Sequence, residues 1–161
     1  MKNPSNKQRF PAIHILSICI GVIYCWFGFL KFFHSYSPAE KLAIDTINII
    51  TFHVLPKQLS LVMLAVSECA IGLLLICRLW MKPTLLLMFV HMFFTFTPFI
   101  FFPEKTFGHQ PYGFTLLGQY IMKNIVIVGA GMVLWQYFVK GYAAMLAVTK
   151  MDEQDAEKVA A

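Results

Sequence analysis

The stretch LAVSECAIGLLLI, residues 64–76, decides the fold. Apart from Ser67 and Glu68 its side chains are small or apolar, and with its flanks it forms an apolar run over 59–79. A helix needs about 20 mostly apolar residues to cross the hydrocarbon core of a bilayer. A carboxylate near the centre of such a helix costs on the order of 3 kcal/mol on insertion scales. The stretch therefore predicts a membrane-spanning helix whose glutamate has a polar partner elsewhere in the protein.

The composition of the whole chain favours lipid as its main solvent. Of the 161 residues, 58% are hydrophobic and only 13% are charged, whereas a soluble domain carries about 25% charged residues. The formal charge of +5 comes from basic residues that flank the apolar segments. They form no groove suited to nucleic acid, which is therefore excluded as a partner. We interpret the chain as a single all-α membrane domain, 1–161, with the lipid bilayer as its first partner.

Four apolar segments are long enough to span a membrane, and lipid leaves no partner for unpaired backbone groups, so each should be helical. They are 12–33, 59–79, 83–102 and 119–139. We interpret the first as a retained anchor. The connection at 38–54 alternates apolar residues with Asp45, Asn48 and Thr51, a pattern typical of a short amphipathic helix at the membrane surface. The fold class predicted is a four-transmembrane-helix bundle with this outer helix between the first two spans and a tail at 141–161.

The distribution of lysine and arginine predicts the orientation of the bundle. Eight of these residues lie on one side of the four spans: Lys2, Lys7, Arg9, Arg78, Lys82, Lys140, Lys150 and Lys158. The other side holds Lys41, Lys57 and Lys105, with Lys31 and Lys123 near helix ends. Because cytoplasmic loops carry the excess of positive charge, both termini are predicted to be cytoplasmic.

Glu68 has a candidate partner at its own depth in the next span. The spans at 59–79 and 83–102 form a hairpin that turns near residues 80–81, and reflecting position 68 across that turn gives a position near 93. His91 is two residues away, about 3 Å along a helix axis. A Glu68–His91 contact is therefore possible at mid-membrane. Alternatively, His91 is a neutral imidazole bonded to a hydroxyl or a carbonyl group.

Lys31, Lys123 and Asn124 lie near the outer ends of their spans. The two lysines either extend to the lipid headgroups or turn inward and neutralise Glu68. Because Lys123 and Asn124 are adjacent on a helix, they diverge by about 100°, and one of them should face protein. We therefore predict an intramembrane polar cluster of Lys31, Glu68, His91, Lys123 and Asn124. Net positive charge there favours an anionic or carbonyl-bearing ligand, such as a quinone headgroup or a lipid phosphate.

Glycines mark the predicted helix contacts, because small residues let membrane helices approach closely. The candidates are Gly21, Gly28, Gly72, Gly129 and Gly131. The four cysteines lie in apolar runs without a metal-ligand or redox spacing. We predict no metal site and no bound cofactor other than a quinone, and the catalytic residues, if there are any, remain unknown.

Three short motifs resemble the DoxX-like family of small membrane proteins. They are GFLKFF at 28–33, ECAIGLLLI at 68–76 and KNIVIVGAG at 123–131. The resemblance covers 12–140 and implies a four-helix bundle in the bacterial inner membrane, with Lys31 and Glu68 as the motif residues. Relatives in that family include a small membrane subunit of a thiosulfate:quinone oxidoreductase. The connections at 37–55 and 103–118 have no counterpart that we can match to the family.

These features lead to two interpretations of function. In the first, the chain is a non-catalytic or accessory membrane subunit with a membrane or periplasmic partner, and its link to redox chemistry is a quinone. In the alternative, it is a small transporter or proton-conducting protein that uses Glu68 and His91. Broken helices or inverted repeats, which are typical of transporters, are not evident in the sequence.

Overall fold

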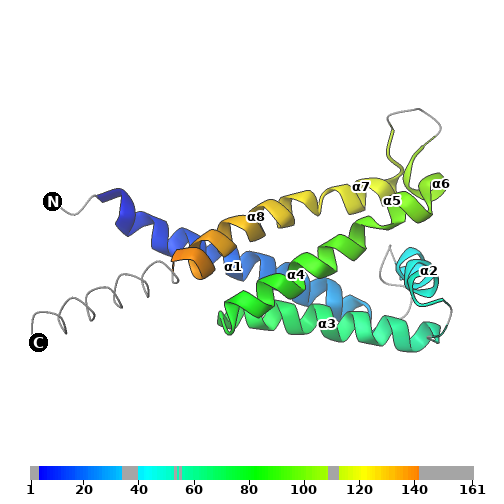
Figure 1. The fold of residues 1–161 in the computed structure, drawn as a ribbon, viewed down its shortest axis with the longest axis horizontal. Helices are drawn as coiled ribbons and strands as arrows, with labels where there is room; N and C mark the ends of the chain where they lie inside the picture. The colour runs from blue at the N-terminus through cyan, green and yellow to red at the C-terminus, as the bar shows by residue number, and fades with distance from the viewer. Residues whose placement is uncertain (1–3, 34–39, 53, 55, 109–112, 142–161) are drawn as a thin grey trace, which may run out of the picture.

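The computed structural model describes residues 4–33, 40–52, 54, 56–108 and 113–141 (Figure 1). Within these residues the chain is helical, apart from turns and one isolated bridge between Phe107 and Phe114. The all-α prediction is thus confirmed for the part of the chain described. Residues 142–161 of the predicted tail at 141–161, and residues 38–39 and 53 of the amphipathic helix predicted at 38–54, lie outside the described residues.

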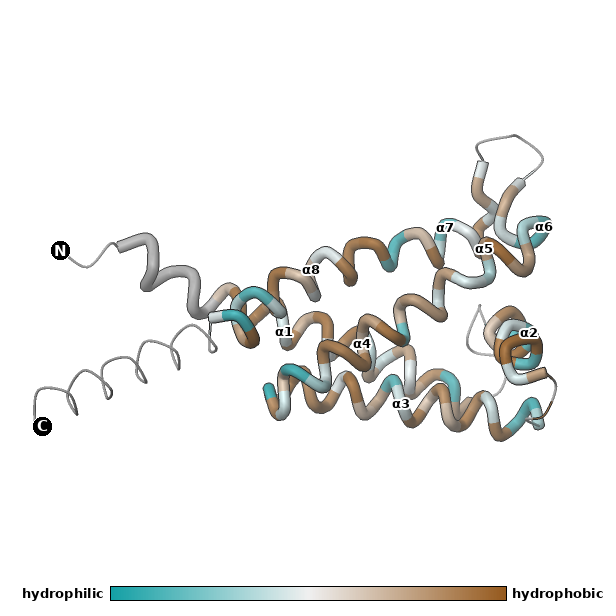
Figure 2. Tube along the Cα trace, viewed as in Figure 1, coloured by the Kyte–Doolittle hydropathy of each residue, from teal (hydrophilic) through white to brown (hydrophobic). Residues whose placement is uncertain are grey.

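Four helical segments are long and apolar enough to cross a membrane, as predicted. They are Ala12–Leu30, Lys57–Cys77, Met81–Phe101 and Leu116–Lys140. The first lies in α1 (Pro4–Leu30), the second is α3 (Lys57–Cys77), the third joins α4 (Met81–Phe96) to α5 (Pro98–Phe101), and the fourth joins α7 (Leu116–Met122), α8 (Ile125–Trp135) and the π-helix η1 (Gln136–Lys140). Figure 2 shows long hydrophobic stretches along these helices and hydrophilic residues concentrated toward their ends.

The third span is interrupted where Pro98 removes a backbone donor. Proline has no N–H, so the carbonyl of Phe94 cannot receive the usual helical bond from position 98. Thr97 satisfies that carbonyl instead, through its backbone N at 3.2 Å and its Oγ1 at 2.7 Å. The helix resumes as α5 without leaving this carbonyl group unpaired in an apolar environment.

Helices α1 and α3 pack against each other along a regular seam. On each helix, a series of buried positions repeats with alternating spacings of four and three residues, the pattern of a coiled-coil contact. The set is Ser17, Gly21, Tyr24 and Gly28 on α1 with Lys31 just after its end, and Leu61, Ala65, Glu68, Gly72 and Leu75 on α3. The seam therefore carries glycines and ionisable residues on the same two helix faces.

Three of the predicted glycines bring the two backbones of this seam together. A Cβ atom on Gly21 would lie 2.7 Å from the carbonyl oxygen of Gly72, and one on Gly72 would lie 2.6 Å from the carbonyl oxygen of Gly21. A Cβ atom on Gly28 would lie 2.9 Å from the backbone N of Cys69. All three contacts are with backbone atoms, so no larger residue fits unless the helices separate.

The two glycines of the fourth span differ from each other. Gly131 is buried, and a Cβ atom there would meet the side chains of Met88 and Phe89 on α4. Gly129 is exposed, and a Cβ atom there would meet nothing within 4 Å. The prediction that Gly129 packs against another helix is wrong within this chain, because positions 129 and 131 point about 200° apart on a helix.

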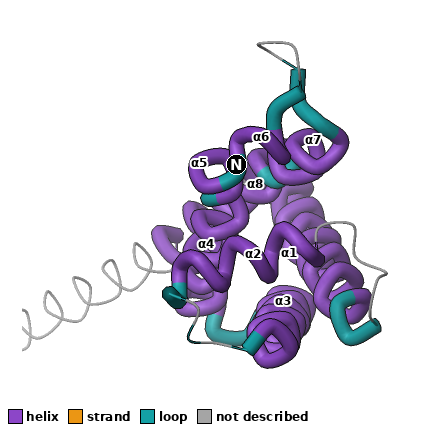
Figure 3. Tube along the Cα trace, turned by 90° about the vertical axis from the view of Figure 1, so that its right-hand side faces the viewer, coloured by secondary structure: helices purple, strands orange, loops and turns teal. Residues whose placement is uncertain are grey.

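Helix α2 (Glu40–Ile50) covers one end of the bundle. Helices α3 and α4 lie close together at the turn that connects them and diverge toward the opposite end of the bundle, where α2 lies (Figure 1). The end view shows α2 lying across this end of the bundle (Figure 3). An ion pair of 3.0 Å between Asp45 Oδ2 and Lys105 Nζ connects α2 to α6 (Pro103–Thr106). The divergence of α3 and α4 creates space under α2, and the candidate site lies there.

Candidate functional site

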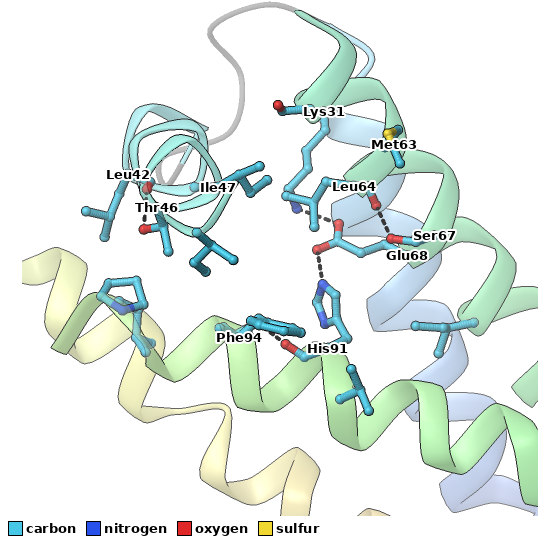
Figure 4. A pocket seen from close by; sticks show the side chains of 18 of the residues that line it. Lys31, Leu42, Thr46, Ile47, Met63, Leu64, Ser67, Glu68, His91 and Phe94 are labelled. Atoms are coloured by element: carbon cyan, nitrogen blue, oxygen red, sulfur yellow. Dashed lines mark hydrogen bonds and ion pairs between the residues drawn. The ribbon is translucent and has the colours of Figure 1, made fainter. Parts of the chain in front are cut away.

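Glu68 lies between two basic side chains from different helices. Lys31, just after the last residue of α1, places its Nζ 2.5 Å from Glu68 Oε2. His91 on α4 places its Nε2 3.0 Å from Glu68 Oε1. Each carboxylate oxygen thus has its own nitrogen partner, as Figure 4 shows. The structure brings these three predicted residues together.

The three groups are withdrawn from the surface. The side chains of Lys31 and Glu68 are 9% and 8% exposed, and that of His91 is 13% exposed. A buried charge is costly unless it is paired and hydrogen-bonded. Here the lysine, the carboxylate and the imidazole satisfy one another, which answers how a glutamate is accommodated in an apolar helix.

Tyr24 extends the cluster toward the core and was not predicted from the sequence. Its hydroxyl lies 3.3 Å from His91 Nδ1, and the two rings meet edge to face. Because a carboxylate oxygen only accepts, Nε2 donates to Glu68, and in a neutral imidazole Nδ1 then accepts from the Tyr24 hydroxyl. Tyr24 precedes Lys31 by seven residues, and this shared helix face is the sequence signal that could have identified it.

A cavity of about 420 Å³ adjoins the cluster. This volume lies within the usual range for small-molecule sites, whose walls are mostly apolar with few polar groups. The polar wall holds Lys31, Glu68 and His91, and α2 forms the roof with residues that include Leu42, Thr46 and Ile47 (Figure 4). The remaining lining residues come from α3, α4, α5 and α7.

Four hydroxyl groups line the cavity as acceptors. Thr46, Ser67 and Thr95 each donate their proton to a backbone carbonyl of their own helix, at 2.7, 2.8 and 2.9 Å. Ser60 donates to the carbonyl of Pro56, the residue before α3, at 3.2 Å. Their oxygen lone pairs can therefore accept from a ligand. Lys31 Nζ carries three N–H donors, and Glu68 Oε2 and the Phe27 carbonyl oxygen (3.5 Å) account for two of them. The site thus suits a ligand with both carbonyl and hydroxyl groups.

Lys123 does not join the cluster, contrary to the prediction. It is exposed, and its Nζ lies 4.8 Å from the ring centre of Tyr120. Asn124 is half-buried at the start of α8 and does not line the cavity. Helix α7 ends at Met122, and α8 begins at Ile125. Both residues between them keep right-handed helical dihedral angles, so the rotation of the fourth span about its axis points Lys123 away from the cluster.

The position of Lys123 changes the expected charge of the site. The predicted net positive charge required two lysines, whereas the cavity is lined by Lys31 and Glu68, whose formal charges cancel. The site therefore suits an uncharged ligand with hydrogen-bonding groups better than a phosphate. Among the described residues, no group of three or more His, Cys, Asp or Glu side chains is placed to hold a metal ion.

No protein-family model, curated protein or solved structure matches the chain. Membership of the DoxX-like family therefore remains a prediction that rests on the short motifs alone.

Proposed function

We propose that this chain is an integral membrane protein of the DoxX-like type that binds an uncharged quinone or quinol headgroup beneath α2. It serves as a non-catalytic or accessory subunit, and a partner protein supplies the electrons. The observation that carries the proposal is the 420 Å³ cavity with apolar walls and the Lys31–Glu68–His91 cluster on one side. The third donor of Lys31 binds a quinone carbonyl, and the hydroxyl oxygens of Ser67, Thr46 and Thr95 accept from a quinol.

Quinone binding is expected to depend on Lys31. In lipid nanodiscs, Lys31→Met should weaken binding of a tail-free dimethoxybenzoquinone by about 10- to 100-fold, the effect of losing a charge-assisted hydrogen bond. Equilibrium binding of the radiolabelled quinone provides the measurement. Lys41→Met is the matched control, because Lys41 is an exposed lysine that does not line the cavity.

A second variant separates loss of a ligand contact from loss of folding. Ser67→Ala removes a cavity hydroxyl and leaves the Lys31–Glu68 ion pair in place. It should weaken quinol binding more than quinone binding, because only the quinol donates a proton to that oxygen. Unchanged binding in both Lys31→Met and Ser67→Ala would disprove the proposed headgroup site.

The alternative of a proton-conducting protein has less support. The hydrogen-bonded series from Lys31 through Glu68 and His91 leads to Tyr24. Tyr24 belongs to a buried cluster that is otherwise apolar and includes Ile71 and Met88. The series therefore leads into an apolar core, so it does not resemble a continuous path across the bundle.

We further propose a bacterial inner-membrane location with both termini cytoplasmic. The α3–α4 turn and η1 lie at the end of the bundle opposite α2 and α6 (Figure 1). Lys7, Arg9, Arg78, Lys82 and Lys140 belong to the end with the α3–α4 turn, whereas the end with α2 and α6 holds Lys41, Lys57 and Lys105. The positive-inside rule assigns the end with the excess of basic residues to the cytoplasm.

Cysteine labelling of intact bacterial cells is expected to reveal this orientation. In a background without native cysteines, Glu104→Cys should react with a membrane-impermeant maleimide, and Lys82→Cys should react only after the membrane is permeabilised. Both native side chains are exposed, so a missing reaction would reflect the side of the membrane and not burial. The reverse pattern would contradict the proposed topology.

A further inference from the structure

The cavity opens sideways through the surface that faces lipid. Four of its lining residues on α3 and α4 are also exposed on the outside of the bundle: Met63 at 55%, Leu87 at 45%, Val90 at 51% and Phe94 at 45%. A side chain that lines a cavity and is about half exposed lies on the rim of an opening. We call these four residues the rim.

The rim lies within the apolar part of the molecule. All four residues belong to candidate spans, Met63 to Lys57–Cys77 and the others to Met81–Phe101. Leu87 and Val90 lie near the middle of their span, and every rim side chain is apolar. An opening at that depth connects the cavity with the acyl chains of a bilayer and not with water.

The roof and the polar wall of the cavity, in contrast to the rim, are formed by side chains with little exposure. Leu42 and Thr46 of α2 are each 4% exposed, and the ion pair of Asp45 with Lys105 holds α2 against α6. Lys31 and Glu68 are buried behind them. The hydrogen-bonding end of a ligand therefore lies deep in the cavity, while the rim offers the apolar exit.

We propose that the ligand is an amphiphile with a single apolar tail, which enters between α3 and α4 from the lipid and leaves its tail in the rim. This inference deepens the proposed function and depends on it. A cavity of this volume holds a drug-sized headgroup and not a long hydrocarbon chain as well. A long tail must then extend through the rim into the bilayer, which identifies the ligand class as tailed quinones and not small water-soluble ones.

A pair of double variants provides the first test. Met63→Trp with Leu87→Trp fills the rim, whereas Val62→Trp with Leu86→Trp places the same residues on neighbouring positions that are 46% and 48% exposed and do not line the cavity. Two probes are compared in nanodiscs: a decyl-tailed dimethoxybenzoquinone and the same ring without a tail. Comparing variants with one probe cancels its partitioning into lipid.

The rim variant should weaken binding of the tailed probe by about tenfold, a usual steric effect in an apolar pocket, and leave the tail-free probe within about twofold of wild type. The control variant should bind both probes as wild type does. If the rim variant binds the tailed probe as tightly as wild type while Lys31→Met still loses the tail-free probe, the lateral opening is disproved and the headgroup site stands. If wild type binds neither probe, the proposed function itself fails.

A second measurement on the unmodified protein does not depend on a variant that folds. A quinone with a photoreactive diazirine on the first carbons of its tail should label peptides of α3 and α4 that contain rim residues. Predominant labelling of α2 peptides would place the tail under the roof and would overturn the lateral route.

Discussion

Replacing Lys31 with leucine is expected to lower the free energy of unfolding by about 3 kcal/mol, the usual cost of leaving one member of a buried ion pair without its partner. The variant keeps Glu68 in its buried position with His91 as its remaining basic neighbour. Glu68→Leu should cost less, because Lys31 follows the end of α1 and its long stem can carry the ammonium group toward the surface. The measurement is thermal unfolding of the purified protein in one detergent.

The double variant separates loss of the pair from loss of one partner. Lys31→Leu with Glu68→Leu leaves neither charge buried, and a buried pair replaced by apolar residues often retains or gains stability. It should therefore be more stable than Lys31→Leu alone. A harmless Lys31→Leu together with a severely destabilising Glu68→Leu would contradict this account of the cluster.

The four spans were predictable because length and hydropathy alone define them. Each predicted span lies within a few residues of a candidate span in the structure. Pro98 marks the break at Thr97 in the sequence, because proline lacks a backbone donor. The break at 123–124 had no such signal, because a hydropathy window averages over it. Such breaks depend on how single carbonyl groups are satisfied, as at Phe94.

The depth of the cluster could be predicted, but the direction of its side chains could not. Counting residues from the turn between the second and third spans placed Glu68 and His91 at one level, and the two are in contact. Helix rotation decides whether residues at one level face each other, and packing sets it. For this reason Lys123 lies on the surface although its level was suitable.

Tyr24 was not predicted to neighbour the cluster, because it looked like an ordinary aromatic residue of a membrane helix. Its hydroxyl group joins the cluster because the packing of the α1–α3 seam places it beside His91. The glycines that define this seam were visible in the sequence at seven-residue and single-turn spacings. Following that face from Gly21 and Gly28 leads directly to Tyr24 and Lys31.

Gly72→Ala is the second substitution for which we expect a large effect, about 2–3 kcal/mol of lost stability. The new Cβ atom would lie 2.6 Å from the carbonyl oxygen of Gly21 and 2.7 Å from the backbone N of Cys25. Backbone atoms cannot rotate away as a side chain can, so α1 and α3 must separate. Because Glu68 lies one turn from Gly72, the separation should also lengthen the Lys31–Glu68 contact and weaken quinone binding.

Gly129→Ala is the matched control for this substitution, since it adds the same methyl group to a helical glycine where nothing lies within 4 Å. Alanine is favoured over glycine inside a helix by about 1 kcal/mol, so this variant should be neutral or slightly stabilised. Thermal unfolding in one detergent compares the two, and quinone binding reports the site. Equal destabilisation by both substitutions would mean that a general intolerance of side chains, and not the α1–α3 contact, explains the result. A destabilised Gly72→Ala that still binds quinone as wild type does would separate the seam from the site.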